Sequence, residues 1–199
     1  IHIEERDLIV RYLQSQQLVN AVIATDISLS MEMSDPSDNL TRRNRPEKLE
    51  IAKRTSLSLG RMVERMNRRN EVTHVAFYGN SKILSPAELY TCGAELGTNF
   101  GGVLKKARKV LESAPDNIGI VYLITDCSVA NSGFSVESAL KVAEEYADER
   151  YYLRLFFIEP DRETKKFANL MTEKAGRNSR IIPVKIGNLD IEAVEDIVD

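Results

Sequence analysis

Residues 18–30, LVNAVIATDISLS, decide the fold, because a near-continuous apolar run from Leu18 to Ala24 is followed by an aspartate and two serines. Residues 118–126, IGIVYLITD, repeat the pattern, since the apolar run from Ile118 to Ile124 also ends in an aspartate. Runs that are apolar on both faces are typical of parallel strands covered by helices on both sides. The two stretches therefore predict strands of a parallel α/β sheet.

Weaker apolar runs extend this sheet. They lie at Val72–Tyr78, Leu153–Ile158 and Ile181–Ile186, with a short edge strand near Lys82–Leu84. Pro183 fits an edge position, where its missing N–H group is not needed.

Segments with helical spacing of apolar residues separate the runs. They extend from Pro46 to about Asn70, from Phe100 to Leu111, over Leu140–Ala147, from Phe167 to a stop at Gly176, and over Ile191–Val198. Strands that alternate with helices predict a doubly wound, Rossmann-like α/β fold. We expect a mostly parallel sheet with one antiparallel edge strand and helices on both faces. One domain, residues 18–199, would follow an N-terminal extension, residues 1–17, that is itself helical.

Composition limits the class of protein. The chain has 199 residues, 43% of them hydrophobic and 29% charged, which suits one globular domain with a sizeable core. A net charge of −3 provides no cationic field for a phosphate backbone, so we expect no nucleic-acid partner. No apolar stretch approaches the ~20 residues that span a bilayer, and the charged start does not resemble a signal peptide. These features favour a cytoplasmic protein without a membrane span.

Five oxygen-bearing side chains are the candidate site. Asp26, Ser28 and Ser30 follow the first apolar run, Asp126 follows the second, and Thr98 lies in a glycine-rich loop before a predicted helix. Ligands of open α/β sheets bind beyond the carboxyl ends of the strands, so these side chains are expected to converge. Because the set contains only hard oxygen donors, it predicts a site for Mg²⁺ or Mn²⁺.

The three motifs, Asp-x-Ser-x-Ser, Gly-Thr-Asn and Thr-Asp after an apolar strand, resemble the metal-ion-dependent adhesion site of von Willebrand factor A domains. The resemblance spans most of the chain and implies that residues 18–199 form such a domain. It implies Ser28, Ser30 and one of Thr98 or Asp126 as direct metal ligands, with Asp26 acting largely through water. It also implies a protein partner whose Asp or Glu carboxylate completes the coordination of the metal.

The sequences of three segments are similar to those of an intracellular branch of this family, the CoxE and magnesium-chelatase D-subunit proteins. The segments are Arg45–Lys53, Arg65–Asn70 and Phe77–Gly79. That likeness implies an adaptor without enzymatic activity that works beside a MoxR-type AAA ATPase. The chain departs from the family at Leu29 and Cys127, where glycine is usual. Side chains at these positions indicate a backbone that avoids positive φ.

The sequence alone leaves other functions open. One is a Mg²⁺-dependent phosphohydrolase with Asp26 as nucleophile, Thr98 on phosphate and Asp126 on the metal. Such enzymes usually carry a second aspartate where this chain has Ser28. No phosphate-binding glycine motif follows a strand, which disfavours a nucleotide-binding enzyme. A structural domain that keeps the ligands but meets no partner is the third possibility.

Overall fold

A computed structural model describes residues 18–32, 48–127, 136–158 and 162–184. They contain one six-stranded sheet in the order β3-β2-β1-β4-β5-β6. The strands are β1 (Val19–Asp26), β2 (Glu71–Phe77), β3 (Ser81–Leu84), β4 (Ile118–Thr125), β5 (Tyr151–Ile158) and β6 (Ser179–Val184). Neighbours pair in parallel except β2 and β3, which are antiparallel. The expected mostly parallel sheet with one antiparallel edge strand is confirmed.

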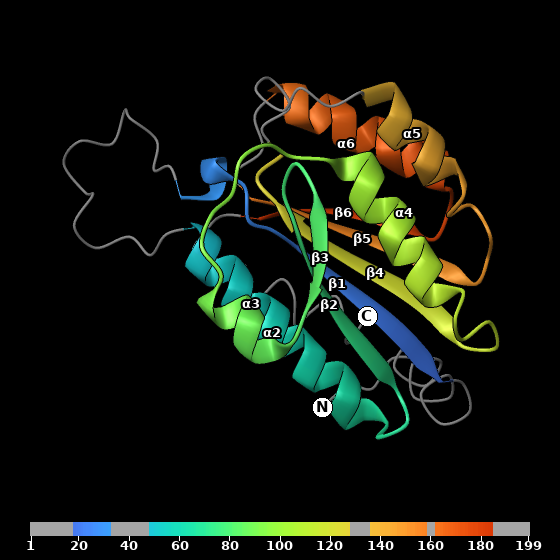
Figure 1. Ribbon diagram of the computed structural model, residues 1–199. Coiled ribbons are helices and arrows are strands. Elements are labelled where there is room, and N and C mark those ends of the chain that lie inside the picture. Colours follow the sequence, from blue (N-terminus) through green and yellow to red (C-terminus); the bar gives the residue numbers. More distant parts are fainter. Residues whose placement is uncertain (1–17, 33–47, 128–135, 159–161, 185–199) are drawn as a thin grey trace, which may run out of the picture.

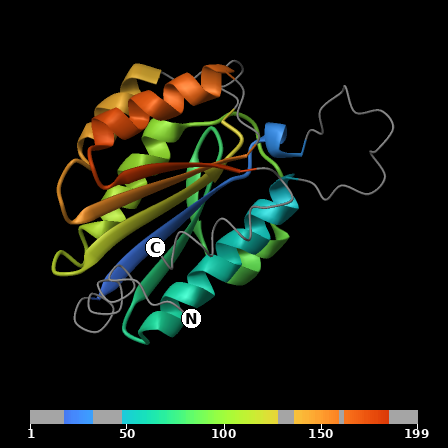
Figure 2. The ribbon, with the colours of Figure 1, turned by 180° about the vertical axis from the view of Figure 1, so that it is seen from behind.

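Helices cover both faces of the sheet (Figures 1 and 2). They are the 3-10 helix η1 (Leu29–Met31) and the α-helices α2 (Lys48–Met66), α3 (Pro86–Thr91), α4 (Phe100–Leu111), α5 (Val136–Glu144) and α6 (Arg162–Ala175). Figure 1 shows α4, α5 and α6 on one face and α2 and α3 on the other. None of these described helices is long and apolar enough to cross a membrane.

Each face of the sheet has its own buried core, because side chains alternate across the pleat of every strand. Val22, Ala24, Val121 and Leu123 point to the α4–α6 side, where Phe100 contacts Phe77 edge-on at 5.6 Å between ring centroids. The other face buries a second set against α2 and α3: Ala21, Ile23, Ala76, Ile124, Phe156 and Ile158. Burial on both faces explains why β1 and β4 read as continuous apolar runs.

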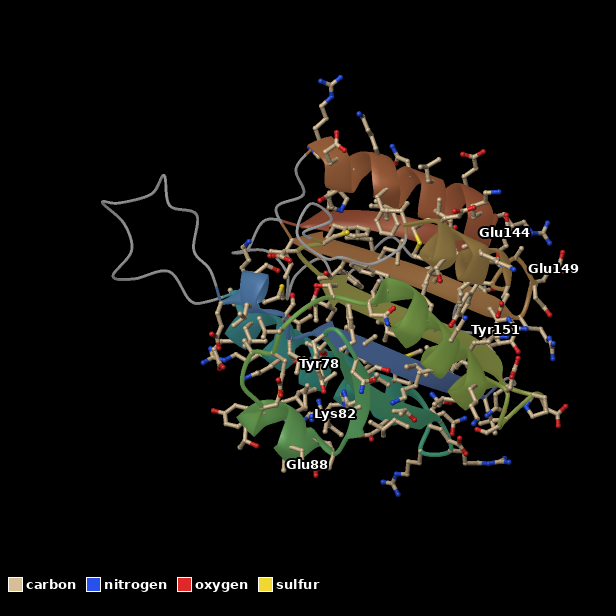
Figure 3. All side chains as sticks on the ribbon, turned by 45° about the horizontal axis from the view of Figure 1, so that its top comes forward. Tyr78, Lys82, Glu88, Glu144, Glu149 and Tyr151 are labelled. Carbon is tan, nitrogen blue, oxygen red and sulfur yellow. The ribbon has the colours of Figure 1, made fainter. Side chains whose placement is uncertain are left out.

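Polar contacts fasten the helices at their ends. The Arg108 guanidinium of α4 lies 3.9 Å from the ring centroid of Tyr151 in β5, and the Tyr146 hydroxyl donates to the Leu104 carbonyl at 2.7 Å. On the other side of the molecule Lys82 lies over the Tyr78 ring at 5.2 Å (Figure 3). These contacts join α4 to β5 and β3 to the end of β2.

Two features differ from the sequence-based expectations. Helix α3 was not predicted; it begins with a capping box in which Ser85 and Glu88 satisfy each other's backbone N–H groups. Helix α2 ends at Met66 rather than near Asn70, since Asn67 accepts the Arg69 N–H and forms a turn.

The predicted end of α6 and the predicted edge position of Pro183 are confirmed. Gly176, with φ of +81°, ends α6 as predicted, and Pro183 lies in the edge strand β6 as predicted. The helices predicted for residues 1–17 and 191–198 lie outside the described residues.

Candidate metal centre

The candidate site lies at the point in the sheet where the order of strand addition changes from one side of β1 to the other. Strand β1 is flanked by β2 on one side and β4 on the other, which makes the β1–β4 boundary a topological switch point. Asp26 is the last residue of β1, and Asp126 follows the last residue of β4. Because Thr25 pairs in register with Ile124, the two carboxylate-bearing ends lie side by side.

Hydrogen bonds join four of the five predicted ligands. The Ser28 and Ser30 hydroxyls lie 3.0 Å apart, and the Ser30 hydroxyl donates to Asp126 Oδ1 at 2.9 Å. The Ser28 N–H donates to Asp26 Oδ1 at 2.8 Å. The expected convergence of Asp26, Ser28, Ser30 and Asp126 therefore occurs.

Asp26 is fully buried, and this changes its acidity. The pKa of Asp26 is raised to about 7, chiefly by loss of hydration on burial and in part by the nearby Asp126 charge. Hydrogen bonds from Thr125 and Ser28 oppose the rise, the Thr125 hydroxyl donating to Asp26 Oδ2 at 2.5 Å. Burying a carboxylate beside a second one is unfavourable unless a cation compensates for the charge.

The loop that contains Thr98 pairs with the backbone at the carboxyl end of β1. Glu95 pairs with the end of β1, donating its N–H to the Ile27 carbonyl at 2.7 Å and accepting the Leu29 N–H at 3.0 Å. Thr98 follows three residues later and is buried. Asn99, rather than Thr98, caps α4 by accepting the Gly102 N–H at 2.8 Å. The Thr98 hydroxyl is therefore not needed for the cap.

Gly97 positions this loop. Its φ is +81°, and a Cβ there would lie 3.2 Å from the Gly79 Cα. Gly97→Ala is therefore expected to lower the free energy of unfolding by ~1–2 kcal/mol, the usual cost of a side chain in left-handed backbone. Urea denaturation measures this loss. Gly93→Ala is the matched control, since no atom lies within 4 Å of its Cβ position, and an equal loss in both variants would contradict the assignment.

Leu29 and Cys127, which replace the usual glycines, differ in backbone conformation. Leu29 is not among the positive-φ residues of the described chain, as expected. The expectation for Cys127 is wrong, because its φ is +48°. Its backbone is held from both sides, with its N–H donating to Thr125 Oγ1 at 2.8 Å and its carbonyl accepting the Thr164 hydroxyl at 2.8 Å. These bonds offset the cost of the left-handed conformation.

Two residues of the site were missed by the sequence reasoning. Thr125 orients Asp26, and its position directly before Asp126 in the Thr-Asp motif could have indicated this role. Lys48, at the start of α2, donates to Asp126 Oδ2 at 3.2 Å. No local pattern marks Lys48, because the contact depends on how α2 lies across the sheet.

The donor set fits a hard divalent cation. Within the described ranges no group of three or more His, Cys, Asp or Glu side chains is placed to hold a metal ion. Any metal here would therefore need the hydroxyl oxygens as well as the carboxylates. Two carboxylates and two hydroxyls within one hydrogen-bonded group are the oxygen ligands that Mg²⁺ and Mn²⁺ accept.

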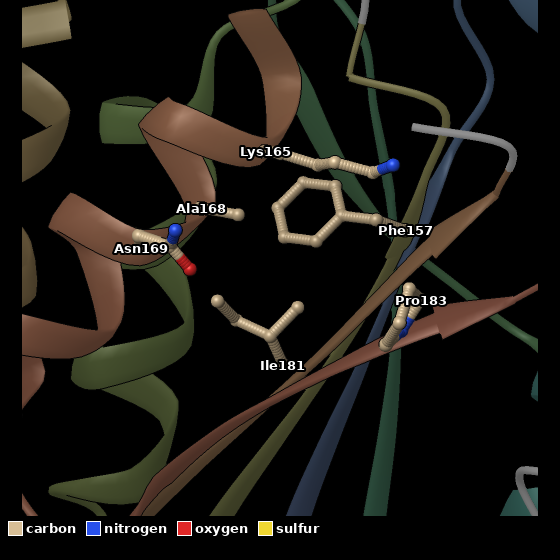
Figure 4. A pocket seen from close by; sticks show the side chains of 6 residues that line it. All are labelled: Phe157, Lys165, Ala168, Asn169, Ile181 and Pro183. Carbon is tan, nitrogen blue, oxygen red and sulfur yellow. The ribbon is translucent and has the colours of Figure 1, made fainter. Parts of the chain in front are cut away.

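A separate cavity of about 280 Å³ lies between α6 and strands β5 and β6 (Figure 4). Its lining is mainly apolar, with Lys165 and Asn169 at α6 and Phe157, Ile181 and Pro183 on the strands. None of the five predicted ligands lines it. The cavity is therefore distinct from the candidate metal centre.

Solved structures place this architecture among known folds. A von Willebrand factor type A protein from Catenulispora acidiphila matches with a TM-score of 0.66 at 17% identity, over 92% of this chain and 42% of that one. The chain has the von Willebrand factor A fold. The SpRpn10 VWA domain matches with a TM-score of 0.65 at 10% identity, over 92% of this chain and 96% of that domain.

Other matches agree with this fold. BatB from Bacteroides thetaiotaomicron, a conserved hypothetical protein, matches with a TM-score of 0.64 at 15% identity, over 90% of this chain and 98% of that one. Comparison of the sequence with protein-family models and with curated protein sequences gave no match. The chain thus spans less than half of the Catenulispora protein but nearly all of SpRpn10 VWA and BatB. At these identities the likeness establishes the von Willebrand factor A fold alone.

Proposed function

We propose that this domain is a metal-dependent protein-binding module. Ser28 and Ser30 would coordinate Mg²⁺ or Mn²⁺ together with Asp126 or Thr98, while Asp26 would act through water. The hydrogen-bonded group of two hydroxyls and two carboxylates at the switch point carries the proposal. Domains of the von Willebrand factor A fold generally mediate protein–protein interaction, which agrees with it.

The bound metal would supply an electrophilic centre for a carboxylate from the partner. Hydroxyl ligands carry no charge, so such a metal keeps much of its positive charge for an outside anion. Asp26 and Thr125 hold the Ser28 backbone and the β4 end in place, and their burial keeps bulk water away from the base of the site. The residues therefore act in binding and orientation.

The surface beside the site suits a protein partner. Leu29 and Leu96 are 40% and 76% exposed, and they directly follow the bridged pair Ser28 and Glu95 on adjacent segments. Exposed apolar side chains next to a polar anchor are typical of protein interfaces. We propose that the partner presents an Asp or Glu flanked by apolar residues, in an assembly with a MoxR-type AAA ATPase.

The burial of Asp26 argues against a phosphohydrolase. A nucleophilic carboxylate needs an oxygen that can reach the phosphorus atom. Asp26 has no exposed surface, and its two oxygens accept hydrogen bonds from Ser28 and Thr125. We therefore infer a binding module without enzymatic activity.

Calorimetric titration with Mg²⁺ and Mn²⁺, combined with a phosphatase assay on the same samples, tests this function. We expect saturable binding of one ion per chain and no metal-dependent phosphate release. Release of phosphate that requires metal and is abolished by Asp26→Asn would instead establish the phosphohydrolase. Absence of both binding and turnover would contradict a metal-dependent function of the wild-type domain.

A further inference from the structure

Lys48 makes the most specific contact at the site that the proposed function does not use. Its ammonium group donates to Asp126 Oδ2 at 3.2 Å, while Asp126 Oδ1 accepts the Ser30 hydroxyl at 2.9 Å. The Lys48 side chain is 20% exposed and that of Asp126 is 7% exposed. The pair is therefore shielded from solvent and weakly screened by salt.

The position of Lys48 in its helix is unfavourable for a cation. It is the first residue of α2, where the partial positive charge of the helix N-terminus repels cations. The other charged pair near this helix end joins Lys53 to Glu50 at 3.0 Å, so Glu50 already has a cationic partner. Among the described residues, the ion pair with Asp126 is thus the interaction that holds the Lys48 ammonium at the site.

A divalent ion on Asp126 would meet the Lys48 charge at close range. The ammonium group neutralises the carboxylate that the metal needs, and two cations bound to one carboxylate repel each other. A partner carboxylate would reduce that repulsion by adding a negative charge at the metal. Lys48 would therefore weaken binding of the metal alone more than binding of metal and carboxylate together.

We propose that Lys48 competes with the divalent ion for Asp126 and sets the metal affinity of the site. This inference rests on the proposed metal-binding function. It assigns to Lys48 a tuning role, so removal of its charge improves metal binding. Removal of a residue that only stabilises the fold would give equal or weaker metal binding.

Titration with Mg²⁺ and with Mn²⁺, at fixed ionic strength, on the wild type and on Lys48→Met is the direct test. Methionine keeps the length of the side chain and removes its charge. We expect the variant to bind either ion about tenfold more tightly, because a positive charge beside the metal site has been removed. Lys48→Arg keeps the charge and should bind like the wild type.

Lys109→Met is the matched control, because Lys109 is exposed near the far end of α4 and its loss changes the net charge equally. It should leave the metal affinity unchanged. Thermal unfolding without metal verifies that each variant is folded, and added Mg²⁺ should raise the Tm of Lys48→Met more than that of the wild type.

The outcomes separate the two proposals. Wild type and Lys48→Met binding metal equally, or the variant binding more weakly, would overturn the role of Lys48 and leave the metal site standing. Binding seen only in Lys48→Met would support the competition. No binding in any variant, Lys48→Met included, would overturn both proposals.

Discussion

Asp126→Ala is expected to abolish metal binding in the concentration range where the wild type saturates. Asp126 links the Ser30 hydroxyl to the Lys48 ammonium and provides a charged oxygen at the site. Loss of groups that merely orient metal ligands costs ~10–100-fold in affinity, so loss of this carboxylate should cost ~100-fold or more. Calorimetric titration with Mg²⁺ measures the change.

Stability gives an independent measurement of the same loss. Ligand at 100 times its Kd stabilises a folded protein by ~2.7 kcal/mol, and this increment should disappear in Asp126→Ala. Asp116→Ala is the matched control, because Asp116 is exposed and precedes β4 at the opposite end of that strand. Equal Mg²⁺-dependent stabilisation of both variants would show that Asp126 is not part of the site.

Asp26→Asn is expected to stabilise the metal-free protein at neutral and alkaline pH. The pKa of Asp26 rises from 3.8 to about 7 on folding, chiefly because burial removes its hydration. The neutral acid is thus favoured in the folded state. The contribution of the Asp26 carboxyl to the free energy of unfolding is fully present below pH 3.8. It is lost as the pH rises toward 7, and it does not change further above pH 7.

The difference in pKa of about 3 corresponds to a loss on the order of 4 kcal/mol in free energy of unfolding. Asparagine stays neutral, and its side-chain oxygen can still accept the Ser28 N–H. The variant should therefore exceed the wild type most at pH 8, by on the order of 2–4 kcal/mol, and least near pH 4.

Urea denaturation in the presence of a chelator, from pH 4 to pH 8, measures this pH dependence. Asp148→Asn is the control, since Asp148 is largely exposed and its pKa is lowered by hydrogen bonds from Arg150. The same pH dependence in the wild type and in Asp26→Asn would refute the account of Asp26. Excess Mg²⁺ should stabilise the wild type more than the Asp26→Asn variant, because the variant keeps the direct metal ligands but lacks the Asp26 charge.

Much of the fold could be predicted because burial on both faces leaves a strong pattern. β1 and β4 lie at the centre of the sheet, and their apolar runs predicted them closely. Helix α3 was missed because it is short, although Ser85-Pro86 with Glu88 is a capping signature that could have indicated it. The end of α2 was placed too late, because the Asn67 turn interrupts a polar stretch without apolar periodicity.

The site was predictable in its residues but not in its electrostatics. Strand-end Asp26 and Asp126 are found from sequence because the carboxyl ends of parallel strands meet at one edge. The left-handed conformation of Cys127 depends on the hydrogen bond from Thr164, which is distant in sequence. The Lys48 contact likewise depends on tertiary packing, and so does the full burial that raises the pKa of Asp26.

Crystals grown with Mn²⁺, and the anomalous signal of that ion, would show whether the proposed metal centre binds a divalent ion. We expect one Mn²⁺ coordinated by the Ser28 and Ser30 hydroxyls and by Asp126 or Thr98, with Lys48 displaced from Asp126. Saturating Mn²⁺ with no anomalous peak at these residues, and with the Lys48–Asp126 pair intact, would contradict this expectation.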